Sequence, residues 1–73
     1  MHHREYVIEP SQQATTGALD LFVEACRTGN LRQQLFALSV LGSATESQLD
    51  LAMPSVQATQ QVTRADIAAM LTR

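Results

Sequence analysis

The 73-residue sequence has no tryptophan, no lysine and only one cysteine. That cysteine, Cys26, excludes an internal disulfide, and a lone thiol is typical of proteins kept in a reducing cytoplasm. The two histidines, His2 and His3, are adjacent at the N-terminus, where chain ends are usually disordered. Metal sites need several ligands that the fold holds together. We therefore expect a cytoplasmic protein without a structural or catalytic metal.

Positive charge and long apolar runs are also scarce. The five arginines are scattered and are outnumbered by seven acidic residues, giving a net charge of −2 and a pI near 5.5. Nucleic-acid binding requires clustered cations that displace counterions. No apolar run approaches the roughly 18 residues of a membrane span, and residues 1–10 lack the apolar stretch of a signal peptide. We expect no nucleic-acid partner and no membrane partner.

The composition of the sequence is typical of helical proteins. Hydrophobic residues make up 45% of the chain, but only three are aromatic, so the core must consist mainly of Leu, Val and Ala. The patterning predicts an all-α fold, a small bundle of about four short helices with an N-terminal extended arm. Residues 1–16 are interpreted as a flexible arm and linker, with a β-prone run at Tyr6–Ile8, and residues 17–73 as the helical domain.

The first helix is predicted over residues 17–28. Thr16 is placed as its N-cap, because a threonine hydroxyl can accept a hydrogen bond from a free N–H of the first turn. Gly29 is expected to end the helix in the left-handed conformation. The apolar stripe, spaced i, i+3, i+4 and i+7, consists of Leu19, Phe22, Val23 and Cys26.

The second helix is predicted over residues 31–41. Asn30 is expected to cap it, with Gln33 completing a variant of the capping box, and Gly42 is expected to end it. Its apolar residues are Leu31, Leu35, Phe36, Leu38, Val40 and Leu41. They occupy more than half of the helix circumference, and such a helix must be covered on most sides. We therefore expect this helix to be the central element of the domain or of its dimer.

Two further capping-box patterns predict two more helices. Thr45 and Gln48 open a short third helix, which Pro54 is expected to stop because proline forces the preceding residue out of the α region. A polar connection is expected over residues 55–61. Thr63 and Asp66 then open the fourth helix, with Val62 and Ile67 placed as a hydrophobic staple.

Catalytic machinery is not apparent. A nucleophile needs a base within hydrogen-bond reach, and Cys26 has no obvious one, since its place on the apolar stripe predicts burial and inertness. Asp20 and Glu24 are four residues apart on a wetter helix side, as on an ordinary solvated face. The glycines at 17, 29 and 42 lie at inferred helix ends rather than in a phosphate-binding loop. We expect no enzyme and no cofactor.

Residues 17–44, GALDLFVEACRTGNLRQQLFALSVLGSA, carry a family resemblance. The positions of Leu21–Phe22, Ala25, Gly29 and Leu31–Leu38 resemble the helical segment after the last carrier domain, and before the thioesterase, in modular type I polyketide synthases. The resemblance implies a linker or docking module that holds one synthase polypeptide against another, with another synthase subunit as its protein partner.

Three alternatives stay open. The Leu19-x-x-Phe22 pattern, with Leu31 and Leu35 downstream and a late Thr63-x-x-Asp66-Ile67, is similar to helical leader regions of ribosomally made peptide precursors. That likeness implies recognition by a modifying enzyme. A small helical regulatory protein unrelated to biosynthesis is a further alternative. Residues 62–71 could also begin a helix-turn-helix, but no recognition helix follows, and the acidic balance disfavours DNA binding.

The sequence therefore favours a non-catalytic docking or adaptor domain. We expect the apolar faces of its short helices to be too extensive for one small chain to cover, and contiguous exposed apolar surface usually marks an interface. The predicted partner interface consists of Leu19, Phe22, Val23, Leu35, Phe36 and Val40. Either a homodimer or a protein partner would cover it.

Overall fold

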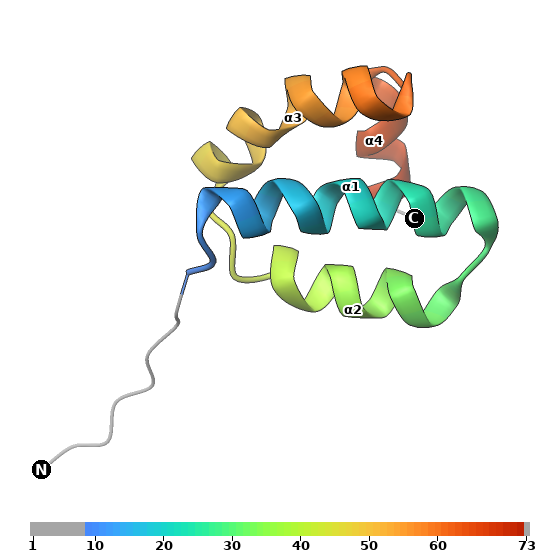
Figure 1. Cartoon of the computed structure of the whole chain (residues 1–73), viewed down its shortest axis with the longest axis horizontal. Coiled ribbons are helices and arrows are strands. Elements are labelled where there is room, and N and C mark those ends of the chain that lie inside the picture. The colour runs from blue at the N-terminus through green and yellow to red at the C-terminus, as the bar shows by residue number, and fades with distance from the viewer. Residues whose placement is uncertain (1–8, 73) are drawn as a thin grey trace, which may run out of the picture.

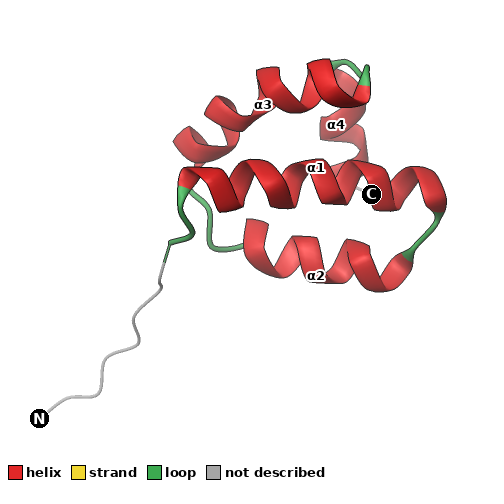
Figure 2. Ribbon diagram, in the orientation of Figure 1, coloured by secondary structure: helices red, strands yellow, loops and turns green. Residues whose placement is uncertain are grey.

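A computed structural model describes residues 9–72, and over this range the chain forms four α-helices joined by short turns, with no strand. The helices are α1 (Gln12–Thr28), α2 (Leu31–Leu41), α3 (Glu46–Gln60) and α4 (Arg64–Leu71) (Figures 1 and 2). The predicted all-α class with four short helices is therefore confirmed. The histidine pair and the proposed arm at Tyr6–Ile8 lie outside the described residues.

Helix α1 begins five residues earlier than the sequence suggested. Ser11 is the N-cap, and its hydroxyl accepts a hydrogen bond from the Ala14 N–H at 3.0 Å. Thr16, the predicted cap, lies inside the helix, where its hydroxyl donates to the Gln12 carbonyl at 3.0 Å. Serine and threonine can satisfy their hydroxyls on preceding helical carbonyls. The polar run before Gly17 is therefore helix, and the predicted linker boundary at residue 16 is wrong.

The start of α1 is tied to the start of α3 by two glutamines. The Gln12 side-chain amide donates to the Gln48 carbonyl at 2.8 Å, and the Gln48 side-chain amide donates to the Pro10 carbonyl at 2.6 Å. The Gln48 side-chain oxygen also accepts from the Thr45 N–H at 2.9 Å, which closes the predicted capping box of α3. These bonds fix the chain around Pro10 against the turn that leads into α3.

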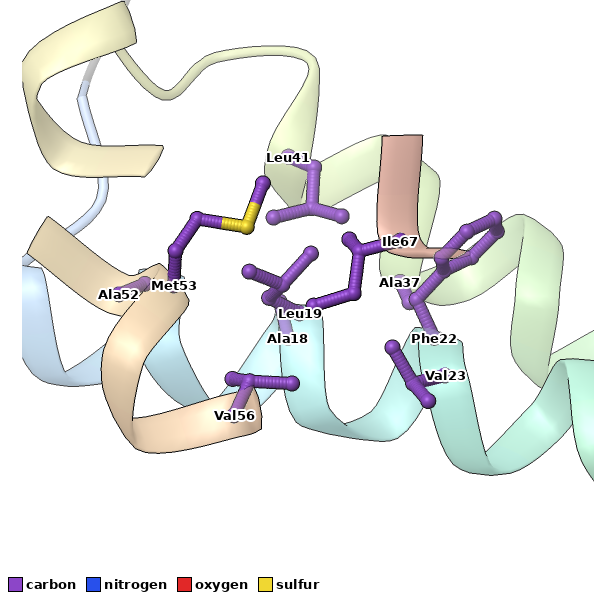
Figure 3. Packing of buried hydrophobic residues seen from close by; sticks show 10 residues of the cluster. All are labelled: Ala18, Leu19, Phe22, Val23, Ala37, Leu41, Ala52, Met53, Val56 and Ile67. Atoms are coloured by element: carbon purple, nitrogen blue, oxygen red, sulfur yellow. The ribbon is translucent and has the colours of Figure 1, made fainter. Parts of the chain in front are cut away.

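Helix α1, and not α2, is the central element. It lies between α2 and α3 in Figure 1 and packs against all three other helices. Its stripe of Ala18, Leu19, Phe22 and Val23 is buried, with Leu19 and Val23 fully so. The rest of the core cluster consists of Ala37, Leu41, Ala52, Met53, Val56 and Ile67 (Figure 3). The prediction that the helix over residues 31–41 is the central element of the domain is wrong, and its place at the centre of a dimer stays a prediction.

Helix α3 continues through Pro54 to Gln60, so the predicted stop at this proline and the predicted polar connection over 55–61 are both wrong. Proline inside a helix removes one hydrogen bond, here to the Asp50 carbonyl, and usually costs about 3 kcal/mol. The helix persists because buried residues lie on both sides of the proline, Ala52 and Met53 before it and Val56 and Gln60 after it. Pro54 itself lies on the exposed side.

The turn into α4 follows the predicted pattern. Gln61 closes α3 in the left-handed conformation at φ 55°. The Thr63 hydroxyl accepts from the Asp66 N–H at 3.0 Å, and the Asp66 carboxylate accepts from the Thr63 N–H at 3.1 Å, so the capping box is confirmed. Ile67 is fully buried in the core and Val62 packs against the same cluster, in the places predicted for a staple. Ile67 is the one buried residue of α4.

Candidate interaction surface

The ends of α2 lie at the residues that the sequence predicted, but only the Asn30 half of the predicted capping box is observed. Gly29 ends α1 at φ 71° in the left-handed region, and the Asn30 side chain accepts a hydrogen bond from the Gln33 N–H at 3.1 Å. The Gly42 N–H donates to the Leu38 carbonyl at 2.8 Å. The two-residue turn makes α2 run back along α1 in the opposite direction (Figure 1).

Helix α2 packs against the rest of the domain through a narrow face. Only Ala37 and Leu41 are buried in its 11 residues. The small Ala37 side chain permits a close approach to the Phe22 region of α1 (Figure 3). The half-buried Gln34 adds a polar contact, because its side-chain amide donates to the Ala25 carbonyl at 3.2 Å. Since this contact side is narrow, most of the circumference of α2 is left uncovered by its own chain.

The uncovered part of α2 carries large apolar side chains. Leu31, Leu35 and Phe36 are each 60–64% exposed, and Leu38 is 38% exposed. Two strips can be separated by helical spacing. Leu31, Leu35 and Leu38 follow each other at i, i+4 and i+7, and we call them the leucine seam. Phe36 lies on another side of the helix with the half-buried Val40, four residues later.

The electrostatic character of this surface is nearly neutral. Arg32 is the only charged residue of α2, and it is exposed in the first turn. The other polar residues of the helix, Gln33, Gln34 and Ser39, carry no charge. An apolar surface with a sparse polar rim is typical of the centre of a protein–protein interface, from which charged residues are depleted.

The six residues predicted as an interface divide into three groups. Leu19, Phe22 and Val23 are buried in the hydrophobic core of the chain. They cannot form a surface, so that part of the prediction is wrong. Leu35 and Phe36 are exposed on α2. Val40 is half-buried and packs against the core cluster.

Sequence reasoning missed Leu31 and Leu38 as surface residues, although it placed both among the apolar residues of this helix. The sequence did contain a signal for them. Apolar residues lie around most of α2, whereas α1 offers only one apolar stripe to cover them. One narrow contact with α1 could bury only a small arc of α2. The remaining apolar positions then had to be exposed.

Leu51, on α3, is 70% exposed, and it is the other large exposed hydrophobic side chain of the described region. Its neighbour Asp50 forms an exposed ion pair with Arg64 at 2.5 Å. A single exposed leucine beside charges is common on protein surfaces and needs no special explanation. It provides a natural control for α2.

A polar contact elsewhere in the domain is structural in character. The buried Gln60 donates its side-chain amide to the Asp20 carboxylate at 3.0 Å, and its carbonyl accepts a hydrogen bond from Arg27. These contacts join α1 to the end of α3. Asp20, predicted to be part of a solvated face with Glu24, is therefore partly covered and engaged, whereas Glu24 is exposed.

Titratable groups do not gather into a reactive centre within residues 9–72. No group of three or more His, Cys, Asp or Glu in that range could hold a metal ion. Cys26 is a free thiol, half-buried and packed against the core cluster. The hydrogen bonds from the backbone and side chain of Thr63 lower the pKa of Asp66 below its ordinary value, which marks a helix cap. The exposed apolar side chains of α2 are therefore the most distinctive surface feature of this part of the chain.

Within the described residues, none of the four helices combines the length and the apolar character that crossing a membrane requires. Comparison of the chain with models of protein families, with curated proteins and with solved structures found no match.

Proposed function

We propose that this protein is a non-catalytic helical docking or adaptor domain that holds another polypeptide against its α2 surface. The observation that carries the proposal is the exposure of Leu31, Leu35 and Phe36, three large apolar side chains within six residues of one helix. Large apolar side chains gathered on one exposed helix often mark an interaction site.

The way in which α2 is built supports the proposal. The helix keeps its place through Ala37, Leu41 and the Gln34 contact, so its large side chains are not needed to fill the core. Both of its ends are capped by the chain itself, at Asn30 and Gly42. The helix is therefore ordered before a partner arrives, which reduces the entropy lost on binding.

The class of partner follows from the resemblance of residues 17–44 to the helical linker of modular polyketide synthases. That segment contains most of α1 and all of α2. Another subunit of a biosynthetic assembly line is therefore the partner class to test first. The likeness to precursor leader regions makes a modifying enzyme the next class.

Site-specific photocrosslinking in the cells that make the protein tests the proposal. Replacing Phe36 with p-benzoylphenylalanine keeps an aromatic ring on α2 and adds a photoreactive group. We expect irradiation to give a discrete protein adduct, which mass spectrometry can identify as a second copy or as a different polypeptide. A matched variant carries the same photoreactive residue in place of Leu51, on α3.

The two positions are comparable because Phe36 is 63% exposed and Leu51 is 70% exposed. An adduct at position 36 that is absent at position 51 supports a docking surface on α2. If position 36 gives no protein adduct, or the same set of adducts as position 51, α2 is an ordinary surface and the proposal is wrong.

A further inference from the structure

We infer that the leucine seam of α2 pairs with the seam of a second copy of this chain, the two helices running antiparallel about a two-fold axis. The inference rests on the proposed function, because it assigns an occupant to one strip of the same surface. It leaves the Phe36 strip free for a different polypeptide.

The spacing of the seam suits helix pairing. Leu31, Leu35 and Leu38 are separated by four and three residues, as are the core positions of a two-helix coiled coil. Gly42 follows at the next core position, where α2 ends. Leu31 and Leu35 are largely exposed within the described part of the chain, and Leu38 is 38% exposed, so it is partly covered by its own chain.

The charges of α2 favour antiparallel pairing of the leucine seams of two copies. Arg32 lies in the first turn, and the helix has no acidic residue there and no basic residue in its last turn. Cations are favourable near helix C-termini and unfavourable near N-termini. In an antiparallel pair, each Arg32 lies beside the C-terminal end of the other α2. The pairing thus supplies the C-terminal end of each α2 with the cation that its own last turn lacks.

A parallel pair would have the opposite electrostatics. Both Arg32 side chains would lie at the same end, and the two helix dipoles would point in the same direction. No acidic residue of α2 could compensate, because the helix has none. The flanking residues Gln34 and Ser39 are neutral, so no charge pattern opposes the antiparallel arrangement.

The size of the seam sets the expected strength. Each copy contributes an apolar area of only a few hundred Å², and the total stays below the roughly 1,200 Å² at the lower end of standard stable interfaces. We therefore expect a reversible dimer with a dissociation constant of about 10 µM to about 1 mM. A partner bound through the Phe36 strip could add to this contact.

Sedimentation equilibrium of the full chain tests the pairing between about 10 µM and about 1 mM. The apparent mass should rise from the 8.0 kDa of one chain toward twice that value. Leu35→Glu should weaken dimerisation at least tenfold, because a carboxylate would be buried at the centre of the seam. Leu51→Glu, the matched control on α3, should leave it unchanged, and circular dichroism should show both variants to be folded.

Cysteine crosslinking tests the direction of the pair, in a Cys26→Ala background that removes the native thiol. In the antiparallel arrangement, Leu35 lies next to the two-fold axis, and Leu31 lies next to Leu38 of the second copy. Leu35→Cys should therefore form a disulfide-linked dimer readily on mild oxidation. Leu31→Cys should crosslink poorly with itself but efficiently when mixed with Leu38→Cys.

The outcomes separate this inference from the proposed function. A chain that stays monomeric up to about 1 mM, or a dimer that Leu51→Glu weakens as much as Leu35→Glu does, overturns the pairing. Strong self-crosslinking of Leu31→Cys overturns the antiparallel direction. If the chain is monomeric but position 36 still crosslinks to another protein, docking stands and the pairing fails. If neither association occurs, both are wrong.

Discussion

Helices α1 and α2 are neighbours that the chain uses in opposite ways. Each carries several large apolar side chains. In α1, Leu19, Phe22 and Val23 are at most 3% exposed, whereas in α2, Leu31, Leu35 and Phe36 are at least 60% exposed. The comparison shows that an apolar pattern in the sequence identifies the apolar face of a helix. The pattern does not show whether the same chain buries that face. The helices packed around it determine whether such a face is buried, and of these two helices only α1 has other helices on several sides.

The strongest test of this comparison is a pair of matched truncations. Leu19→Ala removes a fully buried side chain from the centre of the core and should lower the free energy of unfolding by about 2 to 5 kcal/mol. That would unfold much of a domain of this size, which has only about 3 to 5 kcal/mol of stability. Leu35→Ala should change the free energy by less than about 0.5 kcal/mol.

Urea unfolding at low protein concentration, where the chain is monomeric, measures both values. Equal losses of stability from Leu19→Ala and Leu35→Ala would show that α2 contributes to the fold as much as α1 does. The distinction between a core helix and a docking helix would then be lost.

A second test compares Gln60, at the α1–α3 contact, with Gln34, at the α1–α2 contact. Gln60 is buried at the α1–α3 contact, and Gln60→Ala should destabilise the domain by about 1 to 2 kcal/mol because Asp20 loses its partner in a partly covered site. Gln34 is only half-buried at the α1–α2 contact, so Gln34→Ala should cost about 0.5 kcal/mol. Thermal unfolding monitored by circular dichroism should give this order, and the reverse order would contradict the account.

A third test uses Leu38, which lies between the two extremes. It is 38% exposed, so Leu38→Ala should lower the free energy of unfolding by about 1 kcal/mol. The sequence alone suggested a larger effect, since it placed this residue in a central helix. A loss above about 3 kcal/mol would show that Leu38 belongs to the core.

The smallest expected effect concerns pH and compares the two capping boxes. The pKa of Asp66 is lowered by its hydrogen bonds with Thr63, so its carboxylate stabilises α4 above the ordinary pKa of 3.8. This contribution is lost as the pH falls through the lowered pKa of the folded state. The α3 box uses the neutral Gln48, so its hydrogen bonds do not depend on a carboxylate.

Amide NMR shifts followed from pH 6 downward should therefore change at Thr63, whose N–H donates to the Asp66 carboxylate. Asp66→Asn, which keeps an oxygen that can accept from the Thr63 N–H, is the matched control and should abolish the change. If the shifts at Thr63 titrate identically in Asp66→Asn, the carboxylate is not the source.

Local signals in the sequence predicted much of the fold. Gly29, Asn30, Thr45 and Thr63 act within a few residues of their own position, and the ends that they define are observed. Pro54 misled the prediction because buried residues on both sides hold α3 together despite the lost hydrogen bond. Thr16 misled it because its hydroxyl can bond inside a helix as well as at the cap.

The interface was predicted only in part because burial is a property of the assembled helices. The α1 stripe of Leu19, Phe22 and Val23 and the α2 residues Leu35 and Phe36 are equally apolar. Which of these residues are buried depends on where α3 and α4 pack. The local sequence pattern of α1 or α2 does not contain that information. The α1 residues were therefore assigned to the surface although they form the core.

Concentration-dependent NMR tests most directly the claim that α2 associates while α1 folds the domain. Amide spectra of the chain at about 20 µM and about 2 mM span most of the expected range of dissociation constants. The account predicts shift changes along α2, centred on Leu35, with α3 and α4 unchanged. Identical spectra at both concentrations, or changes centred on Leu51 of α3, would contradict it.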